Sequence, residues 1–108
     1  MYGHTLVHRA ALFAALGDET RLELVGTLAT GAPRSISQLA AGSLLTRQAI
    51  TKHLRVLEHA GVVRGAKVGR ENVFALRAEP LREMQAYLAR VAAHWDDALA
   101  RLRAYVEE

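Results

Sequence analysis

The chain has 108 residues, 51% of them hydrophobic, no cysteine, and 14 Lys and Arg against 11 Asp and Glu, for a net charge of +3. This composition is that of a globular chain, and the length fits one domain spanning 1–108 but not a two-domain cofactor-dependent enzyme. The absence of cysteine excludes disulfides, thiolate metal sites and cysteine nucleophiles. The sequence shows no signal peptide and no apolar run near the ~20 residues that span a bilayer, so we expect a cytoplasmic protein with no membrane partner.

The charge is unevenly distributed along the chain. Residues 1–33 carry two basic and three acidic residues, net −1, and residues 78–108 carry four basic and six acidic residues, net −2. Residues 34–77 between them carry eight basic and two acidic residues, net +6. A basic middle between acidic ends favours binding of a polyanion such as nucleic acid, although a solvated basic surface gives the same count.

Two helices are predicted in the first 30 residues. The first covers residues 6–16, ends at Gly17, and has an apolar face comprising Leu6, Val7, Ala10, Phe13 and Ala14. Asp18 is suited to cap the second helix, because its carboxylate can accept a free N–H group of the first turn. The apolar side of the second helix comprises Leu22, Leu24, Val25, Leu28 and Ala29.

Two more helices follow a Gly- and Pro-containing turn at residues 31–33. Residues 35–38 match a capping box, with a serine at the cap and a glutamine three positions later. The short helix after this cap is predicted to bury Ile36, Leu39 and Ala40. Gly42 and Ser43 interrupt it, and Thr46 caps a longer helix over residues 46–60.

After this helix the pattern becomes extended, and residues 63–76 are predicted to form a two-stranded hairpin. Gly69 can supply the positive φ of a tight turn at its tip. An isolated two-stranded hairpin is weak, so it must rest on the helices. Lys67 and Arg70 make the tip basic and suit it to contact phosphates, which position a protein on DNA without reading its sequence.

The last helix is predicted over residues 81–106, and Pro80 suits its first turn. Its apolar residues recur every three or four positions along ~39 Å of helix at 1.5 Å per residue. The rest of the chain is too small to cover such a stripe, so we predict a homodimer. The alternative is that Trp95 and its neighbours fold back onto the core of the protomer. The predicted dimer contacts are Leu81, Met84, Leu88, Val91, Trp95, Leu99 and Leu102.

The helix over 46–60 carries the predicted function. At 100° per residue its apolar residues gather on one side and its polar residues on the other. Arg and Lys side chains can bond guanine or a phosphate, Gln can bond adenine, and Thr can contact a thymine methyl group. The polar side is predicted to carry no carboxylate, unlike the exposed side of most surface helices. We therefore predict that it binds double-stranded DNA. The predicted DNA contacts are Thr46, Arg47, Gln48, Thr51, Lys52 and Arg55, together with Lys67 and Arg70 of the hairpin.

Three other basic residues lie outside these two groups of predicted contacts. His53 falls within the apolar arc of the 46–60 helix, and we predict a partly buried histidine bonded to the backbone. Arg34 and Arg64 suit either further phosphate contacts or an ordinary solvated surface.

The order of elements predicts a winged helix-turn-helix, mostly α with a small β-hairpin and a long C-terminal dimerisation helix. The segments Ala15–Leu22, Leu45–Leu57 and Ala60–Val63 resemble signature motifs of the ArsR-type winged-helix repressors, in the same order and spacing. The resemblance covers nearly the whole chain. It implies a homodimer joined through its first and last helices, operator binding through the helix at Thr46 and the wing at Gly69, and derepression by a signal. The inducer, a small molecule or a protein, stays open.

The chain departs from the metal-sensing members of that family. Those members place cysteines near the third helix, where this chain has residues 34–37 without one. A second family site uses Asp and His pairs on the last helix, and only His94 and Asp97 resemble half of it. We therefore expect no metal and no cofactor. A metal-responsive repressor that uses His94 and Asp97, with Glu83, at the dimer interface remains an alternative.

Two alternatives lie outside this function. No nucleophile elbow, phosphate-binding loop or zinc-protease motif occurs, so we expect no enzyme. A dimeric scaffold that binds protein through the basic face would show no salt-dependent affinity for DNA, whereas the predicted repressor, bound to an inverted-repeat operator, would show a steep one.

Overall fold

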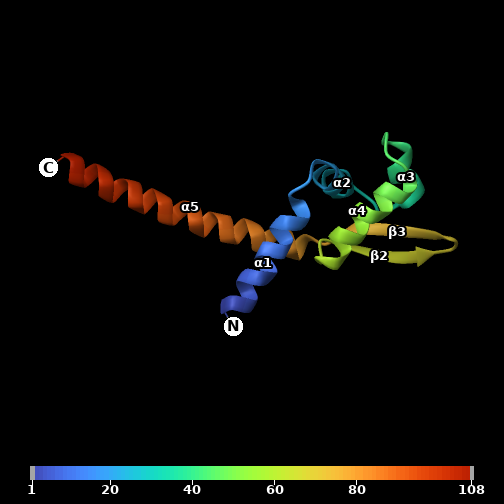
Figure 1. Cartoon of the computed structure of the whole chain (residues 1–108), viewed down its shortest axis with the longest axis horizontal. Helices are drawn as coiled ribbons and strands as arrows, with labels where there is room; N and C mark the ends of the chain where they lie inside the picture. Colours follow the sequence, from blue (N-terminus) through green and yellow to red (C-terminus); the bar gives the residue numbers. More distant parts are fainter. Residues whose placement is uncertain (1, 108) are drawn as a thin grey trace.

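The computed structural model describes residues 2–107 and is mostly helical with a small antiparallel sheet, as predicted (Figure 1). A compact body occupies one end of the molecule, and the last helix extends from it (Figure 1). No described helix is long and apolar enough to cross a membrane. The elements are α1 (Tyr2–Leu16), α2 (Glu19–Ala29), β1 (Arg34–Ser35), α3 (Ile36–Ala41), α4 (Arg47–His59), β2 (Val63–Val68), β3 (Glu71–Leu76) and α5 (Ala78–Glu107).

The predicted helix caps are all formed. The carboxylate of Asp18 accepts the Arg21 N–H at 3.0 Å at the start of α2. Ser35 and Gln38 form a reciprocal capping box before α3, with bonds of 3.1 and 2.8 Å. The Thr46 hydroxyl accepts the Ala49 N–H at 3.1 Å at the start of α4. These bonds satisfy backbone donors that a helix start leaves free, which is why local sequence alone located three helix starts.

The core confirms the predicted inward faces of α3 and most of α4, but corrects those of α1 and α2. In α1 the buried residues are Leu12 and Ala15, whereas Leu6 and Val7 are 50% and 69% exposed. Helix α1 crosses the base of α5, and its first half extends beyond the core (Figure 1), so Leu6 and Val7 remain exposed in the protomer. The core comprises Leu12, Ala15, Leu24, Leu28, Ile36, Leu39, Ile50, Leu54, Leu57, Val62, Val63, Phe74 and Met84.

Two further side chains lie outside the core against expectation. Leu22 of α2 is 54% exposed, because α2 presents Leu24 and Leu28 to the core instead. Val56 of α4 is also exposed, at the edge of the arc that buries Leu54 and Leu57. The predicted apolar faces of α2 and α4 therefore each included a side chain that lies outside the core.

The hairpin predicted over 63–76 is present as β2 and β3, and it belongs to a three-stranded sheet of order β1-β3-β2. Val68 pairs with Glu71, so the turn consists of Gly69 and Arg70 alone. Gly69 has φ +63°, as the first position of a type II′ hairpin turn requires. The third strand, β1, was not predicted, because two residues are too short for a periodic pattern. Its pairing with β3 ties the hairpin to the helical body.

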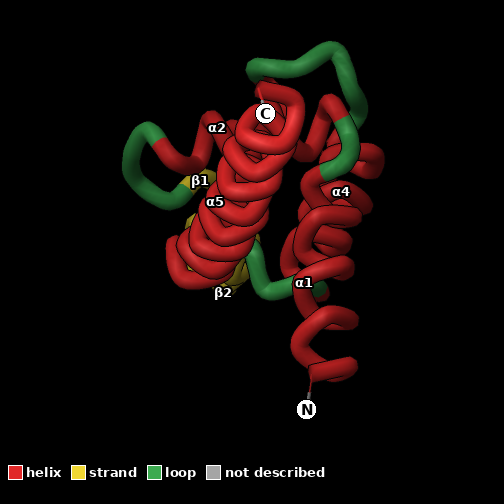
Figure 2. Tube along the Cα trace, turned by 90° about the vertical axis from the view of Figure 1, so that its left-hand side faces the viewer, coloured by secondary structure: helices red, strands yellow, loops and turns green. Residues whose placement is uncertain are grey.

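Helix α5 begins in the core and then leaves it. Pro80 and Met84 are buried, so Met84 is corrected from a dimer contact to the protomer core. Leu81 packs against the core but stays partly exposed, and its dimer contact stays a prediction. Beyond Met84, α5 projects along the long axis of the molecule (Figure 1). Figure 2 shows this helix from its C-terminal end. The radius of gyration is 18.4 Å, against about 13 Å for a compact domain of this length. The elongation leaves most of α5 without a partner in the protomer.

Replacing Gly65 by alanine is expected to destabilise the fold by about 1–3 kcal/mol, because the new methyl group overpacks the core. An added Cβ would lie 2.8 Å from Cε1 of the buried Phe74. The matched control is Gly26→Ala in α2, where a Cβ meets nothing within 4 Å and the helix gains roughly 0.5–1 kcal/mol. Urea unfolding at one protein concentration measures both changes. A Gly65→Ala variant as stable as wild type would contradict this packing.

Candidate nucleic-acid interface

Helix α4 presents the predicted polar side to solvent. Arg47, Gln48, Lys52 and Arg55 are exposed and Thr51 is half-buried, while the opposite side lies in the core. No hydrogen bond or ion pair within the described residues engages the side chains of Arg47, Gln48 or Lys52. Their donors are therefore free to bind a ligand at the N-terminal end of the helix, where the helix dipole favours an anion.

Thr51 is partly engaged by its own helix. Its hydroxyl donates to the Arg47 carbonyl oxygen at 2.7 Å, a bond that threonine often makes to the preceding turn. The hydroxyl oxygen can still accept a hydrogen bond, and the methyl group can still contact an apolar surface.

The prediction that this side of α4 is free of carboxylates is wrong. Glu58 lies one turn after Arg55, and its Oε1 atom is 3.3 Å from Nη1 of Arg55. By the same 100° rule that grouped the cations, Glu58 falls on their side, so the sequence contained the signal. Arg55 is thus held by an ion pair, whereas the cations nearer the N-terminus of α4 are not.

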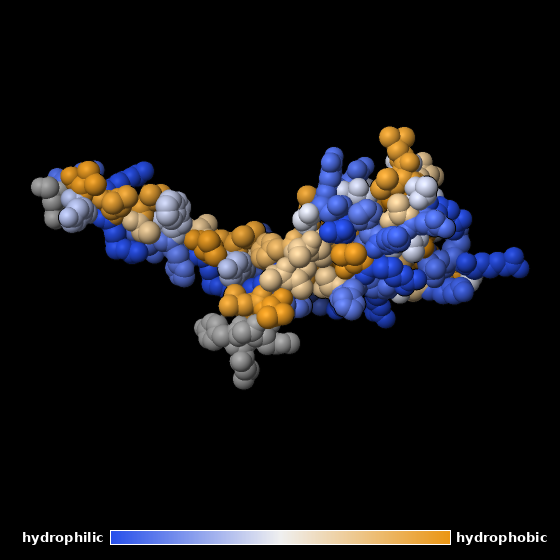
Figure 3. Space-filling view, viewed as in Figure 1, coloured by the Kyte–Doolittle hydropathy of each residue, from blue (hydrophilic) through white to orange (hydrophobic). Residues whose placement is uncertain are grey.

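The hairpin places its basic residues at its exposed tip. Lys67 pairs across the hairpin with Asn72, and Arg70 occupies the turn. Figure 3 shows hydrophilic side chains concentrated over the end of the molecule that α4 and the hairpin form. The structure therefore brings the two groups of predicted contacts to the same end of the molecule.

A polar cluster missed by the sequence reasoning fixes α4 against α1 and α2. Arg21 donates to the carbonyl oxygens of Ala14 and Ala15 at the end of α1, and its Nη1 atom lies 3.2 Å from Nδ1 of His53. His53 Nδ1 also lies 3.7 Å from the Asp18 carboxylate. His53 is partly buried, as predicted, but its Nδ1 atom contacts the side chains of Arg21 and Asp18 and makes no bond to the backbone among the described residues. Residues 18–21 and 53 are too far apart in sequence for a local pattern to pair them.

The ionised form of Asp18 is favoured in this cluster. The hydrogen bond from the Arg21 N–H lowers the pKa of Asp18 below its ordinary value of 3.8, and the charges of Arg21 and His53 act in the same direction. Folding therefore favours the carboxylate. This contribution to stability is present above the ordinary pKa and is lost as the pH falls through the lowered one.

The exposed part of α5 and the first half of α1 form a large apolar surface. Leu88, Val91, Trp95 and Leu102 are between 46% and 63% exposed, and Leu99 is half-buried. Leu6 and Val7 add exposed apolar residues on α1, which packs against the base of α5. Orange side chains follow α5 and reach α1 in Figure 3. An exposed apolar surface of this extent marks an interaction site.

The residues of the alternative metal site do not come together within the protomer. Glu83 lies 3.2 Å from Nε2 of His8 on α1, while His94 and Asp97 are exposed further along α5. Among the side chains that the structure describes, those of residues 6–107, no group of three or more His, Asp or Glu is placed to hold a metal ion.

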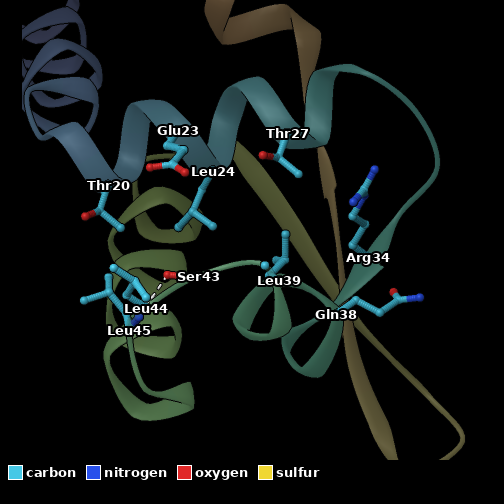
Figure 4. Close-up of a pocket in the computed structure, with 11 residues that line it drawn as sticks. Thr20, Glu23, Leu24, Thr27, Arg34, Gln38, Leu39, Ser43, Leu44 and Leu45 are labelled. Carbon is cyan, nitrogen blue, oxygen red and sulfur yellow. Dashed lines mark hydrogen bonds between the residues drawn. The ribbon is translucent and has the colours of Figure 1, made fainter.

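A cavity of about 330 Å³ lies between α2 and the turn that joins α3 to α4 (Figure 4). Leu24 and Leu39 give it an apolar wall, and Leu44 and Leu45 of the turn stand below Thr20 and Glu23 at one end. Arg34 and Gln38 stand at the other end (Figure 4). Its volume and mixed lining are those of a site for a small molecule.

Known proteins match the chain over most of its length. A family model described as a helix-turn-helix domain matches residues 16–66. The HTH-type transcriptional regulator YuzN of Bacillus subtilis is 35% identical over 83 residues, which cover 71% of this chain and 90% of YuzN.

Solved structures share the fold. The structure of an ArsR-like transcriptional regulator from Rhodococcus sp. RHA1 superposes with a TM-score of 0.79 and 41% identity, covering 92% of each chain. A winged helix-turn-helix DNA-binding domain from Mycobacterium bovis, described as homodimeric and as a possible ArsR-family regulator, superposes with a TM-score of 0.68 at 21% identity. It covers 91% of this chain and 87% of that one. These matches confirm the predicted winged helix-turn-helix fold.

Proposed function

The chain belongs to the ArsR-type family of winged helix-turn-helix transcriptional regulators, and from that premise we propose a homodimeric repressor that binds an inverted-repeat operator through α4 and the wing. The observation that carries the proposal is the set of exposed, unengaged donors on α4, at the same end of the molecule as the basic tip of the hairpin. A scaffold that binds protein does not need exposed, unengaged donors on one helix. A protein that recognises DNA bases in the major groove does need them.

The residues divide into two roles. Arg47 and Gln48, in the first turn of α4, are suited to read bases in the major groove, because arginine bonds guanine and glutamine bonds adenine through two hydrogen bonds each. Thr51 and Lys52 add contacts along the same side, and the exposed Thr46 adds one at the start of the helix. Lys67 and Arg70 of the wing are suited to bind phosphates and to fix the position of α4.

The homodimer is proposed from the apolar surface on α5 and α1. A stripe with a spacing of three or four residues pairs best with the same stripe of a second copy. Dimerisation would present two copies of α4 to one face of DNA, with half-sites about one helical turn apart. The homodimeric domain from Mycobacterium bovis has the same fold and supports this arrangement.

The salt dependence of DNA affinity tests this function against the scaffold. Fluorescence anisotropy with a labelled random duplex, repeated between about 50 and 200 mM salt, gives the slope of log affinity against log salt. We expect a steep negative slope, because Lys and Arg side chains that bind the phosphates release the salt cations condensed on the DNA. Affinity for DNA that is absent, or that does not change with salt, would contradict the proposal.

Replacing Arg70 by alanine is expected to weaken binding to all duplexes about equally and to reduce the salt slope by about 1, since one phosphate contact is lost. The same anisotropy titration on an operator and on a random duplex measures both effects. The control is Arg101→Ala, which removes the same charge from the exposed end of α5. An Arg70→Ala variant that weakens only one sequence would assign this residue to base reading instead.

We also propose that a small-molecule inducer would bind the cavity of Figure 4. An occupant would contact Leu45, next to the Thr46 cap on which the start of α4 depends. Methyl NMR signals of Leu44 and Leu45 can be followed while small molecules are screened for loss of operator affinity. A compound that shifts these signals and weakens binding would support the site. One that weakens binding while shifting only α5 signals would contradict it.

A further inference from the structure

One carboxylate joins the recognition helix to the wing. Oε1 of Glu58 pairs with Arg55 on α4 at 3.3 Å, and Oε2 accepts the backbone N–H of Gly65 in β2 at 3.2 Å. Strand β2 is an edge of the sheet, so its outward N–H groups have no strand to pair with. Glu58 thus satisfies an edge donor and an arginine at the same time, one with each oxygen.

The residue at position 65 leaves room for this contact. A Cβ on Gly65 would lie 2.8 Å from Oε2 of Glu58, closer than real Cβ atoms approach an oxygen. A glycine in the interior of a strand costs stability, and close approach of another group is a common reason for one. The wing is therefore shaped to receive the carboxylate.

The contact between Glu58 and Gly65 closes one side of a small polar notch between α4 and the wing. The notch has a volume of about 130 Å³. Its charged groups are Arg55, Lys67 and Glu58, for a net charge of +1, and the Asn72 amide adds hydrogen-bond donors. The residues that line it are Arg55, Glu58, Gly65, Ala66, Lys67, Asn72 and Phe74. Two cations and an amide around a notch of this size suit one phosphate group.

We propose that Glu58 is a positioning residue for DNA binding, whose carboxylate holds the wing against α4 and aims Arg55, so that Arg55, Lys67 and Asn72 form one seat for a backbone phosphate. The inference rests on the proposed function, since it assigns a contact of the same DNA interface. Asn72 thereby joins the DNA-contacting residues.

The proposal predicts an effect of opposite sign to simple electrostatics. Removing a negative charge next to DNA should strengthen binding, because the remaining cations attract the phosphates more. If Glu58 positions the wing and Arg55, its removal should weaken binding instead. The sign of the change therefore separates the two accounts.

The test compares three variants by anisotropy on one duplex at one salt concentration. Glu58→Ala is expected to lower affinity about tenfold and to reduce the salt slope by about 1, the loss of one phosphate contact. Glu58→Gln keeps an oxygen for the Gly65 N–H and is expected to lose less. The matched control, Glu71→Gln, removes a charge from the exposed end of the wing and is expected to bind slightly more tightly. A Glu58→Ala variant that binds as tightly as wild type, or more so, would overturn the proposal.

A measurement without DNA tests the restraint itself. Amide hydrogen exchange of Gly65 is expected to be faster in Glu58→Ala than in wild type, and close to wild type in Glu71→Gln. Unchanged exchange in Glu58→Ala would overturn the restraint. A wild-type protein that binds no duplex would instead show failure of the proposed function, so the two failures are distinguishable.

Discussion

Replacing Val91 by aspartate is expected to convert the proposed dimer into a monomer and to lower affinity for a two-half-site operator by roughly 100-fold or more. Val91 lies in the exposed apolar stripe of α5, between Leu88 and Trp95. An aspartate there would place a charge in an apolar interface without a partner. The affinity falls because two half-sites bound by one dimer gain a factor of about 10²–10⁴ over a single contact.

The matched control is Ala93→Asp, which places the same charge on α5 but on the side opposite the stripe. Sedimentation velocity gives the oligomeric state, and anisotropy gives the operator affinity. Leu88→Asp should repeat the effect of Val91→Asp. A Val91→Asp protein that stays dimeric, or a monomeric one that binds the full operator as tightly as wild type, would contradict the role of α5.

Replacing Arg47 or Gln48 by alanine is expected to relax base preference at one operator position each, at a cost of about 1–3 kcal/mol per lost two-bond contact. Both side chains are exposed in the first turn of α4 and have no partner among the described residues. Competition between operators that differ at one base pair measures the preference. The fold should be unaffected, because neither side chain packs in the core.

Arg101→Ala serves as the control for the loss of charge alone, since Arg101 lies near the C-terminal end of α5, which spans Ala78–Glu107. It is expected to leave base preference unchanged. If Arg47→Ala and Gln48→Ala both leave the affinity and the base preference of wild type intact, α4 does not read the operator through this side.

The elements that sequence predicted best are those with local signals. The caps at Asp18, Ser35 and Thr46, and the glycine at position 69, each determine backbone geometry within a few residues. The regular recurrence of apolar residues along α5 could also be seen in the sequence. It could not show where the protomer core ends and the dimer interface begins, because helix packing in either place requires the same spacing. Met84, which is buried in the protomer, was assigned to the dimer surface for that reason.

The features that sequence missed depend on contacts between distant segments. Arg21 and His53 meet only when α2 and α4 pack, and β1 exists only because β3 lies beside it. Glu58 was overlooked although its angle on α4 could be calculated. Its contact with Gly65 could not be, because it depends on how the wing folds back onto α4.

Selection of duplexes from random DNA by the intact protein at physiological salt, sequenced after a few rounds, tests the central claim most directly. The account predicts enrichment of an inverted repeat whose half-sites lie about one helical turn apart. Such a repeat would show a sequence-specific dimer and would supply the operator for every variant above. Recovery of duplexes with no common sequence would contradict operator recognition and the base-reading roles of Arg47 and Gln48.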